Sequence, residues 1–339
     1  MKHDRTLGVS ATKNILARVL AKPWATDAGG RAALAYAAFA IVCIVWGTTY
    51  LAIRVAVTTM PPFLLTGARY LFGGVVLFVV AKLHGDAIPR SRRVLGDVVL
   101  CGVLMVAIGN LSVVWAEQWV PSGFAALFVG TAPFWVSLIE LMRRTGERVE
   151  LRRGVGMLIG FIGVALLVTP RGAGKAFDAR FVIGALAIQA GCIAWQYGTV
   201  RGKYALVSVP PLMSSALQML AGGAVVTIAG LSLGELPHFH STPRTFAALA
   251  YLAIFGSVLT YTSYVYAARH LRTTTLSLYA YVNPLVAVLL GWFVLHEQLT
   301  WVSITAMVII LTGVALVQSS RGAAQRATLS HDAAAERAA

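Results

Sequence analysis

The stretch CIVWGTTYLAIR, residues 43–54, belongs to a long apolar run, yet it carries a tryptophan, a tyrosine and two threonines before an arginine. The same tryptophan recurs 149 positions later, where Trp195 corresponds to Trp46 and Lys203 corresponds to Arg54. An ordered series of such matches predicts an internal repeat. Further pairs follow in chain order at offsets of 149 to 151: Pro61-Pro62 with Pro210-Pro211, Gly73-Gly74 with Gly222-Gly223, Phe128 with Tyr279, Pro133 with Pro284, and Glu147 with Glu297.

Composition places both copies in a membrane. Hydrophobic residues make up 58% of the chain and charged residues only 12%, whereas soluble proteins carry about 25% charged residues. Apolar windows of about 20 residues are long enough to span a bilayer as helices. A helix is required because lipid offers no hydrogen bonds, so every backbone N–H and C=O group must find a partner within the protein. The sequence therefore predicts an all-α polytopic membrane protein with ten transmembrane helices. The expected spans are 33–53, 63–81, 97–117, 122–142, 154–169, 181–200, 210–230, 246–268, 273–296 and 300–318.

The net charge of +15 would indicate a nucleic-acid partner in a soluble protein, but its distribution favours a topological role. If the ten spans alternate in direction, 22 of the 28 lysines and arginines fall on one side, which also holds both termini. Basic residues are retained in the cytoplasm, so we expect both termini there and no nucleic-acid binding. Residues 1–32 are then a basic cytoplasmic tail, and residues 319–339 a disordered cytoplasmic tail.

The repeat fixes the expected architecture. Each copy holds five spans, in residues 33–169 and 181–318. Because five is odd, the second copy starts on the opposite side of the membrane and runs inverted. Inverted repeats are typical of secondary transporters, in which the binding site lies near the bilayer midplane and opens to alternate sides. A channel or a lipid-handling protein is the alternative class, although neither requires an inverted five-plus-five arrangement.

Longer motifs resemble a known family. WGTTYLAIRVAVTTMPPFLLTGARYLFGG in the first copy, and IFGSVLTYTSYVYAARH and YAYVNPLVAVLLGWFVLHEQLT in the second, are similar to EamA-type permeases of the drug/metabolite transporter superfamily. The resemblance covers residues 33–318 and is strongest to the bacterial inner-membrane members. It implies ten helices and the export or exchange of small metabolites or drugs, without specifying the substrate.

Aromatic and amide side chains within the spans are the candidates for substrate binding. Trp46 and Tyr50 lie four residues apart and hence on one face of the helix. They either line a substrate pocket, or they anchor the helix at the membrane interface or pack it against its neighbours. Trp195, as the repeat mate of Trp46, has the same two interpretations. An amide in hydrocarbon needs partners, so mid-span amides should face the bundle interior. The remaining candidates are Asn110, Trp115, Gln196 and Tyr264.

A second group is expected to act in gating or in structure. Arg69 is the one basic residue inside a predicted span, so it either binds an anion or extends its side chain to the membrane surface. Its repeat mate, Gln218, favours a shared structural hydrogen-bonding role. Prolines at equivalent positions should bend the fourth and ninth helices. The group comprises Arg69, Pro133, Gln218, Asn283, Pro284 and Glu297.

Other chemistry has little support in the sequence. The three cysteines lie in apolar spans, no ligand spacing for a metal occurs, and no GxxxxGK[ST] loop for ATP is present. We therefore expect no enzyme activity, metal or cofactor, and either a monomer or a homodimer. The neutral, aromatic pocket residues favour amino acids or related amphipathic compounds and drugs as substrates. Without a mid-span carboxylate, facilitated transport or exchange is favoured over proton coupling.

Overall fold

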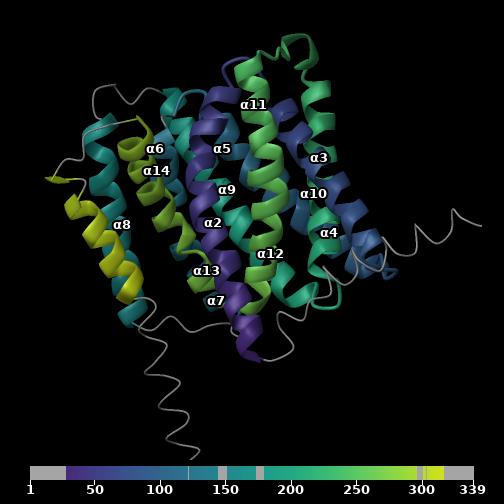
Figure 1. The fold of residues 1–339 in the computed structure, drawn as a ribbon, viewed down its shortest axis with the longest axis horizontal. Coiled ribbons are helices and arrows are strands. Elements are labelled where there is room, and N and C mark those ends of the chain that lie inside the picture. Colours follow the sequence, from purple (N-terminus) through teal and green to yellow (C-terminus); the bar gives the residue numbers. More distant parts are fainter. Residues whose placement is uncertain are drawn as a thin grey trace, which may run out of the picture.

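A computed structural model describes residues 28–120, 122–143, 151–172, 179–295, 301–302 and 304–316 of the 339-residue chain. These residues form one bundle of helices (Figure 1). We call the end at which the first helix begins, drawn downward in Figure 1, the lower end, and the opposite one the upper end. The predicted C-terminal tail and Glu297 lie outside the described residues.

The first repeat contains the first five expected spans. The first two are single helices, the third is interrupted by a π-helix, and the fourth is broken between two short helices. The elements are α2 (Ala28–Ala56), α3 (Pro62–Leu83), α4 (Arg92–Gly102), the π-helix η1 (Val103–Asn110), α5 (Leu111–Ala116), α6 (Ser122–Val129), α7 (Ala132–Arg143) and α8 (Leu151–Gly172).

The second repeat follows the same plan, including a π-helix in its third span and a break in its fourth. Its elements are α9 (Ala179–Ala205), α10 (Pro211–Ser232), the short 3-10 helix η2 (Leu236–His238), α11 (Pro243–Tyr251), the π-helix η3 (Leu252–Leu259), α12 (Thr260–His270), α13 (Thr273–Leu276), α14 (Tyr279–Leu295) and a last apolar helix, Ile304–Leu316.

Seven helices in the described part of the chain are long and apolar enough to cross a membrane, and two shorter apolar helices accompany them. Two boundaries differ from the predicted ones. Helix α2 begins at Ala28, inside the segment predicted as tail, because AGGRA continues the helix beyond its most apolar part. Helix α8 covers 22 residues rather than the 16 of its apolar window, so flanking polar residues complete its length.

Proline and threonine mark where helices start and break. Pro62 and Pro211 are the first residues of α3 and α10, where a missing N–H costs no helical hydrogen bond. Thr242 and Thr245 form a reciprocal capping box at the start of α11. Pro133 lies one residue after the break between α6 and α7, whereas Pro284 lies inside α14.

The two repeats run in opposite directions. Arg54, near the end of α2, donates a hydrogen bond to the carbonyl oxygen of Glu117, which follows α5, so both helices end at the upper end. Helix α9 is antiparallel to the third span, because Gly184 contacts Ala116 whereas Gly198 contacts Met105. The second repeat therefore begins at the upper end, as an inverted repeat requires.

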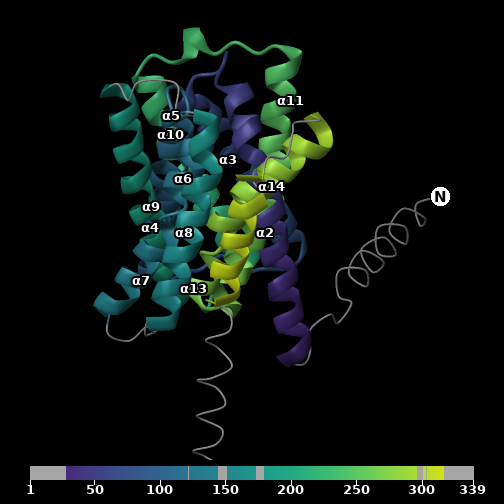
Figure 2. The ribbon, with the colours of Figure 1, turned by 90° about the vertical axis from the view of Figure 1, so that its left-hand side faces the viewer.

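Helices sort into two groups around α2 and α9. Figure 1 shows α3, α4 and α10 on one side and α6, α8 and α14 on the other. Figure 2 shows α8 beside the last helix, and the segment containing η2 crossing the upper end from α10 to α11. The interface between α3 and α10 is the most extensive contact between the repeats, and glycines let the two helices approach closely. A Cβ at Gly74 would lie 2.8 Å from Cγ of Leu220.

Gly222 provides a test of close packing on another face of α10, against α4 and η1 of the first repeat. A Cβ at this position would collide with the carbonyl oxygen of Gly102 and lie 2.6 Å from Cβ of Val106. Gly222→Ala should lower the melting temperature of the purified protein in detergent, because overpacking costs about 1–3 kcal/mol. Gly96→Ala is the matched control, since a Cβ there meets nothing within 4 Å. It should leave stability unchanged or raise it, and equal melting temperatures for the two variants would contradict the packing argument.

Candidate functional site

A cavity of about 70 Å³ lies between the two repeats. Both repeats contribute to its wall, which joins two broad aromatic rings to amide, hydroxyl and guanidinium groups. The lining residues are Trp46, Thr49, Tyr50, Ile53, Arg69, Gly109, Asn110, Val113 and Val129 from the first repeat, and Gly191, Cys192, Trp195, Gln196, Tyr279 and Asn283 from the second. The cavity is therefore mostly apolar with a few polar groups, as small-molecule sites are.

The π-helices hold the two tryptophans in place. A π-helix forms i→i+5 bonds and is frequent at functional sites. Trp46 of the first repeat donates from Nε1 to the carbonyl oxygen of Gly256, in η3 of the second repeat, at 3.2 Å. Trp195 of the second repeat packs against Gly109 in η1 of the first, so closely that a Cβ at Gly109 would lie 2.9 Å from its ring. Each tryptophan thus contacts the π-helix of the other repeat.

An aromatic cluster closes the cavity toward the lower end. The ring of Trp46 lies 5.4 Å from that of Trp195, 5.1 Å from Tyr264 and 5.0 Å from Tyr279. Trp195 donates from Nε1 to the hydroxyl of Tyr264 at 2.9 Å, and Thr199 contacts the same hydroxyl at 2.8 Å. Trp46 meets Trp195 and Tyr279 edge-to-face and lies tilted against Tyr264, an arrangement in which aromatic rings attract one another, and we call this cluster the aromatic floor.

Five of the seven predicted binding residues line the cavity: Trp46, Tyr50, Asn110, Trp195 and Gln196. Tyr264 does not line it but is fully buried in the floor below. Trp115 also lies outside the lining and packs edge-on against Trp119, with ring centres 4.7 Å apart. It lies two residues past the lining residue Val113, which is about 200° of rotation around α5, so it points away from the cavity.

Two amides in the lining leave hydrogen-bonding atoms unused. Oδ1 of Asn110 and Nε2 of Gln196 are buried without a hydrogen-bond partner among the described residues. An unsatisfied buried polar atom costs about 1–3 kcal/mol, so such atoms usually serve a ligand or an ordered water. The cavity therefore offers one acceptor and one donor to an occupant.

The predicted gating or structural residues fall into different places. Asn283 lines the cavity, and when its amide nitrogen faces Cys43 and Tyr279 it donates to both carbonyl oxygens at 3.0 Å. Gln218 lies outside and is fully engaged, donating to Ser214 at 2.8 Å and accepting from Tyr261 at 2.9 Å. Pro133 and Pro284 are buried beside the broken fourth and ninth spans.

Arg69 lines the cavity and does not extend to the membrane surface. Its side chain is 2% exposed, and Nε donates to Ser257 in η3 at 3.0 Å. Its guanidinium carbon lies 4.8 Å from the ring centre of Tyr70. The surface-seeking interpretation is therefore wrong, because the ring of Tyr70 and the hydroxyl of Ser257 hold the guanidinium inside the bundle.

Sequence reasoning missed lining residues that lack a conspicuous pattern. Thr49 and Cys192 are ordinary residues of apolar helices, and only their facing positions bring them to the cavity. Tyr279 had a usable signal, since it is the repeat mate of Phe128 and adjoins the predicted Asn283. Its ring contacts both Trp46 and Tyr264.

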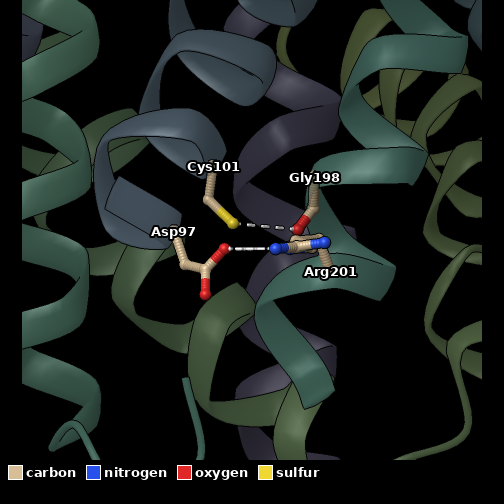
Figure 3. Close-up of polar contacts among 4 residues, drawn as sticks. All are labelled: Asp97, Cys101, Gly198 and Arg201. Carbon is tan, nitrogen blue, oxygen red and sulfur yellow. Dashed lines mark hydrogen bonds and ion pairs between the residues drawn. The ribbon is translucent and has the colours of Figure 1, made fainter. Parts of the chain in front are cut away.

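An ion pair joins the repeats below the aromatic floor, near the lower end (Figure 3). Arg201 of α9 donates to Oδ1 of Asp97 of α4 from Nε at 3.0 Å and from Nη2 at 2.6 Å. Cys101, one turn after Asp97, donates to the carbonyl oxygen of Gly198 at 3.5 Å. We call Asp97 and Arg201 the lower latch.

The lower latch has no counterpart in the other half of the repeat. At the offset of 149 residues, Asp97 corresponds to Phe246 and Arg201 corresponds to Ala52. Those residues cannot form an ion pair. The upper interface between α2 and α11 combines apolar packing, which includes Ala56 and Ala248, with a hydrogen bond between Thr48 and Tyr251. The ion pair therefore joins the repeats at the lower end without an equivalent at the matching positions of the upper end.

These features define a class. Two inverted repeats of apolar helices, with a polar-aromatic cavity between them, are the construction of a membrane transporter. The family model for EamA-like transporters matches residues 33–169 and again residues 182–319. The chain belongs to the EamA-like transporter family, whose members are transporters and not enzymes.

Individual relatives agree with this assignment. The inner membrane transporter YedA of Escherichia coli (strain K12) is 36% identical over 275 residues, which cover 81% of this chain and 87% of YedA. Protein PagO of Salmonella typhimurium is 26% identical over 84% of this chain and 92% of its own length. A crystal structure of a protein 22% identical covers 83% of this chain and 95% of its own, with a TM-score of 0.72, and shows the same fold.

Breaking the lower latch should open the lower end. In a protein whose other cysteines, Cys43 and Cys192, are replaced by alanine, Cys101 is a fully buried reporter beside the latch. Asp97→Asn should raise the rate of Cys101 labelling by a water-soluble maleimide several-fold, because a neutral amide binds the guanidinium more weakly.

The exchanged pair, Asp97→Arg with Arg201→Asp, should restore slow labelling. Gly96→Ala, which changes α4 at an exposed position without touching the pair, serves as the control. Unchanged labelling in Asp97→Asn, or fast labelling in the exchanged pair, would contradict a latch.

Proposed function

We propose that this transporter moves a small amphipathic organic compound by alternating access, acting as an exporter or exchanger. The observation that carries the proposal is the cavity between the inverted repeats, with an aromatic floor and two unsatisfied amide atoms in its lining. Because the repeats are inverted, exchanging their conformations would move the closed floor from one end to the other. A carrier needs this exchange of conformations between the repeats, whereas a channel with a continuous pore does not.

The lining supports the proposed substrate class. Two tryptophan rings offer flat apolar surface, while Asn110 and Gln196 offer hydrogen bonds, which suits amino acids, their analogues or aromatic drugs. No metal or nucleotide is part of the proposal, so the substrate gradient itself drives transport. Export as the direction rests on the family resemblance, and location in the inner membrane rests on the name of YedA.

Transport can be measured directly in proteoliposomes. Uptake of a labelled mixture of amino acids should saturate and should accelerate when unlabelled amino acids are preloaded inside. Trp46→Ala should reduce this uptake at least about ten-fold, because it removes the central ring of the floor and its bond to η3.

Trp301→Ala is the matched control, since Trp301 is 83% exposed and does not line the cavity. It should transport normally. Uptake that never saturates and ignores preloading would indicate a channel, and equal uptake in both variants would remove Trp46 from the transport path.

The topology is tested separately. We expect both termini in the cytoplasm, from the distribution of basic residues. Alkaline phosphatase is active only outside the cytoplasm, so fusion to the C-terminus should give an inactive enzyme, whereas fusion in the segment between α10 and α11 should give an active one. The reverse pattern would overturn this orientation and would leave the fold unchanged.

A further inference from the structure

We propose that Arg69 binds a carboxylate of the transported compound, so that the substrate is an organic monoanion or a zwitterion. The inference rests on the proposed function and deepens it, because it names the chemical group that the cavity recognises. It starts from the side chain of Arg69, which is buried in the cavity wall and has no counter-ion among the residues that the structure describes.

Arg69 is placed for binding and not for packing alone. It lines the cavity and is 2% exposed, and its Nη1 is buried with no hydrogen-bond partner in the described part of the chain. Nε is held by Ser257 at 3.0 Å, and the guanidinium carbon lies over Tyr70 at 4.8 Å. One edge of the group is therefore fixed while donors on the rest stay available, which is the orientation that a carboxylate needs for a fork-like contact.

The repeat mate shows what a purely structural residue looks like at this position. Gln218 is equally buried, but both of its amide atoms are engaged, one with Ser214 and one with Tyr261. Arg69 occupies the equivalent position in the first repeat. Unlike Gln218, it carries a charge, and its Nη1 has no hydrogen-bond partner among the described residues. Since both positions could have been satisfied by a neutral amide, the charge at Arg69 has another purpose.

No acidic group of the protein neutralises this cation within the described residues. Arg69 forms no ion pair there, and the titratable group that interacts with it is the phenol of Tyr70. Glu117, which is fully buried, interacts with Arg54 instead. An unpaired buried charge costs several kcal/mol, so a membrane-embedded arginine without a counter-ion is expected to meet one on its ligand.

The single positive charge of the site and its otherwise uncharged lining favour a carboxylate over other anions. One guanidinium balances one negative charge, whereas a phosphate ester carries nearly two at neutral pH. The rest of the lining is uncharged and aromatic, which suits an apolar or zwitterionic body attached to the anion. Inorganic chloride presents the same single charge, so the experiment must separate it from an organic carboxylate.

The test compares carboxylates with their neutral amides on the purified full-length protein. Tryptophan fluorescence reports occupancy, because Trp46 and Trp195 line the cavity. The probes are L-phenylalanine against L-phenylalaninamide, L-leucine against L-leucinamide, and benzoate against benzamide, in a sulfate buffer free of chloride and of carboxylates. Sodium chloride is titrated separately. At least one carboxylate should bind about ten-fold or more tightly than its amide, as expected for a charge-assisted pair.

Arg69→Gln should abolish that preference, and Arg69→Lys, which keeps the charge, should retain part of it. Arg244→Gln removes an exposed charge near the start of α11 and should retain all of it. Melting curves establish that each variant is folded. The proposal is overturned if no carboxylate is preferred, if the preference survives in Arg69→Gln, or if only chloride titrates the wild-type signal.

The two proposals fail in different ways. If proteoliposomes transport amides as fast as carboxylates, Arg69 is not a carboxylate site but the carrier mechanism stands. If carboxylates bind through Arg69 yet no labelled compound shows flux stimulated by preloading, alternating access is wrong and the anion site stands.

Discussion

The reciprocal contact between each tryptophan and the π-helix of the other repeat is the constraint from which the rest of the site follows. Trp46 bonds to the Gly256 carbonyl in η3, and Trp195 packs on Gly109 in η1. The two π-helices lie 149 residues apart, the same offset as the tryptophans. Because each repeat positions a ring of the other, the floor of the cavity forms only when the inverted copies are docked, and a shift between the copies must disturb it.

The apolar interior of the helix bundle explains why few polar groups remain available to bind a substrate. Buried polar atoms are costly without partners, so nearly every mid-membrane polar group in the floor is engaged, as Tyr264 is with Trp195 and Thr199. Against that background, unused atoms on Arg69, Asn110 and Gln196 stand out, and all three residues line the same cavity. The lower latch adds an ion pair between the repeats where the repeat mates, Phe246 and Ala52, form none.

The repeat and much of the cavity lining were predictable from the sequence. The matched tryptophans, glycine pairs and prolines predicted the repeat, and five of the proposed pocket residues were identified as polar or aromatic groups inside apolar windows. Trp115 fitted the same criterion but does not line the cavity, and its ring packs against Trp119 instead, because helical phase decides which way a ring points. Asp97 and Arg201 were invisible as a pair, since they lie 104 residues apart.

The sequence by itself determined the helical class, the duplication and its inversion, because hydrophobic windows of bilayer length, an odd number of spans per copy and an ordered series of matches require no coordinates. Only the tertiary structure decided which surroundings and which hydrogen-bond partners each side chain has. Arg69 faces the cavity and not the membrane surface because the two repeats bring Ser257 within 3.0 Å of it. The position of a charge in a span follows from the chain, whereas its partner, or the lack of one, depends on helices more than a hundred residues away.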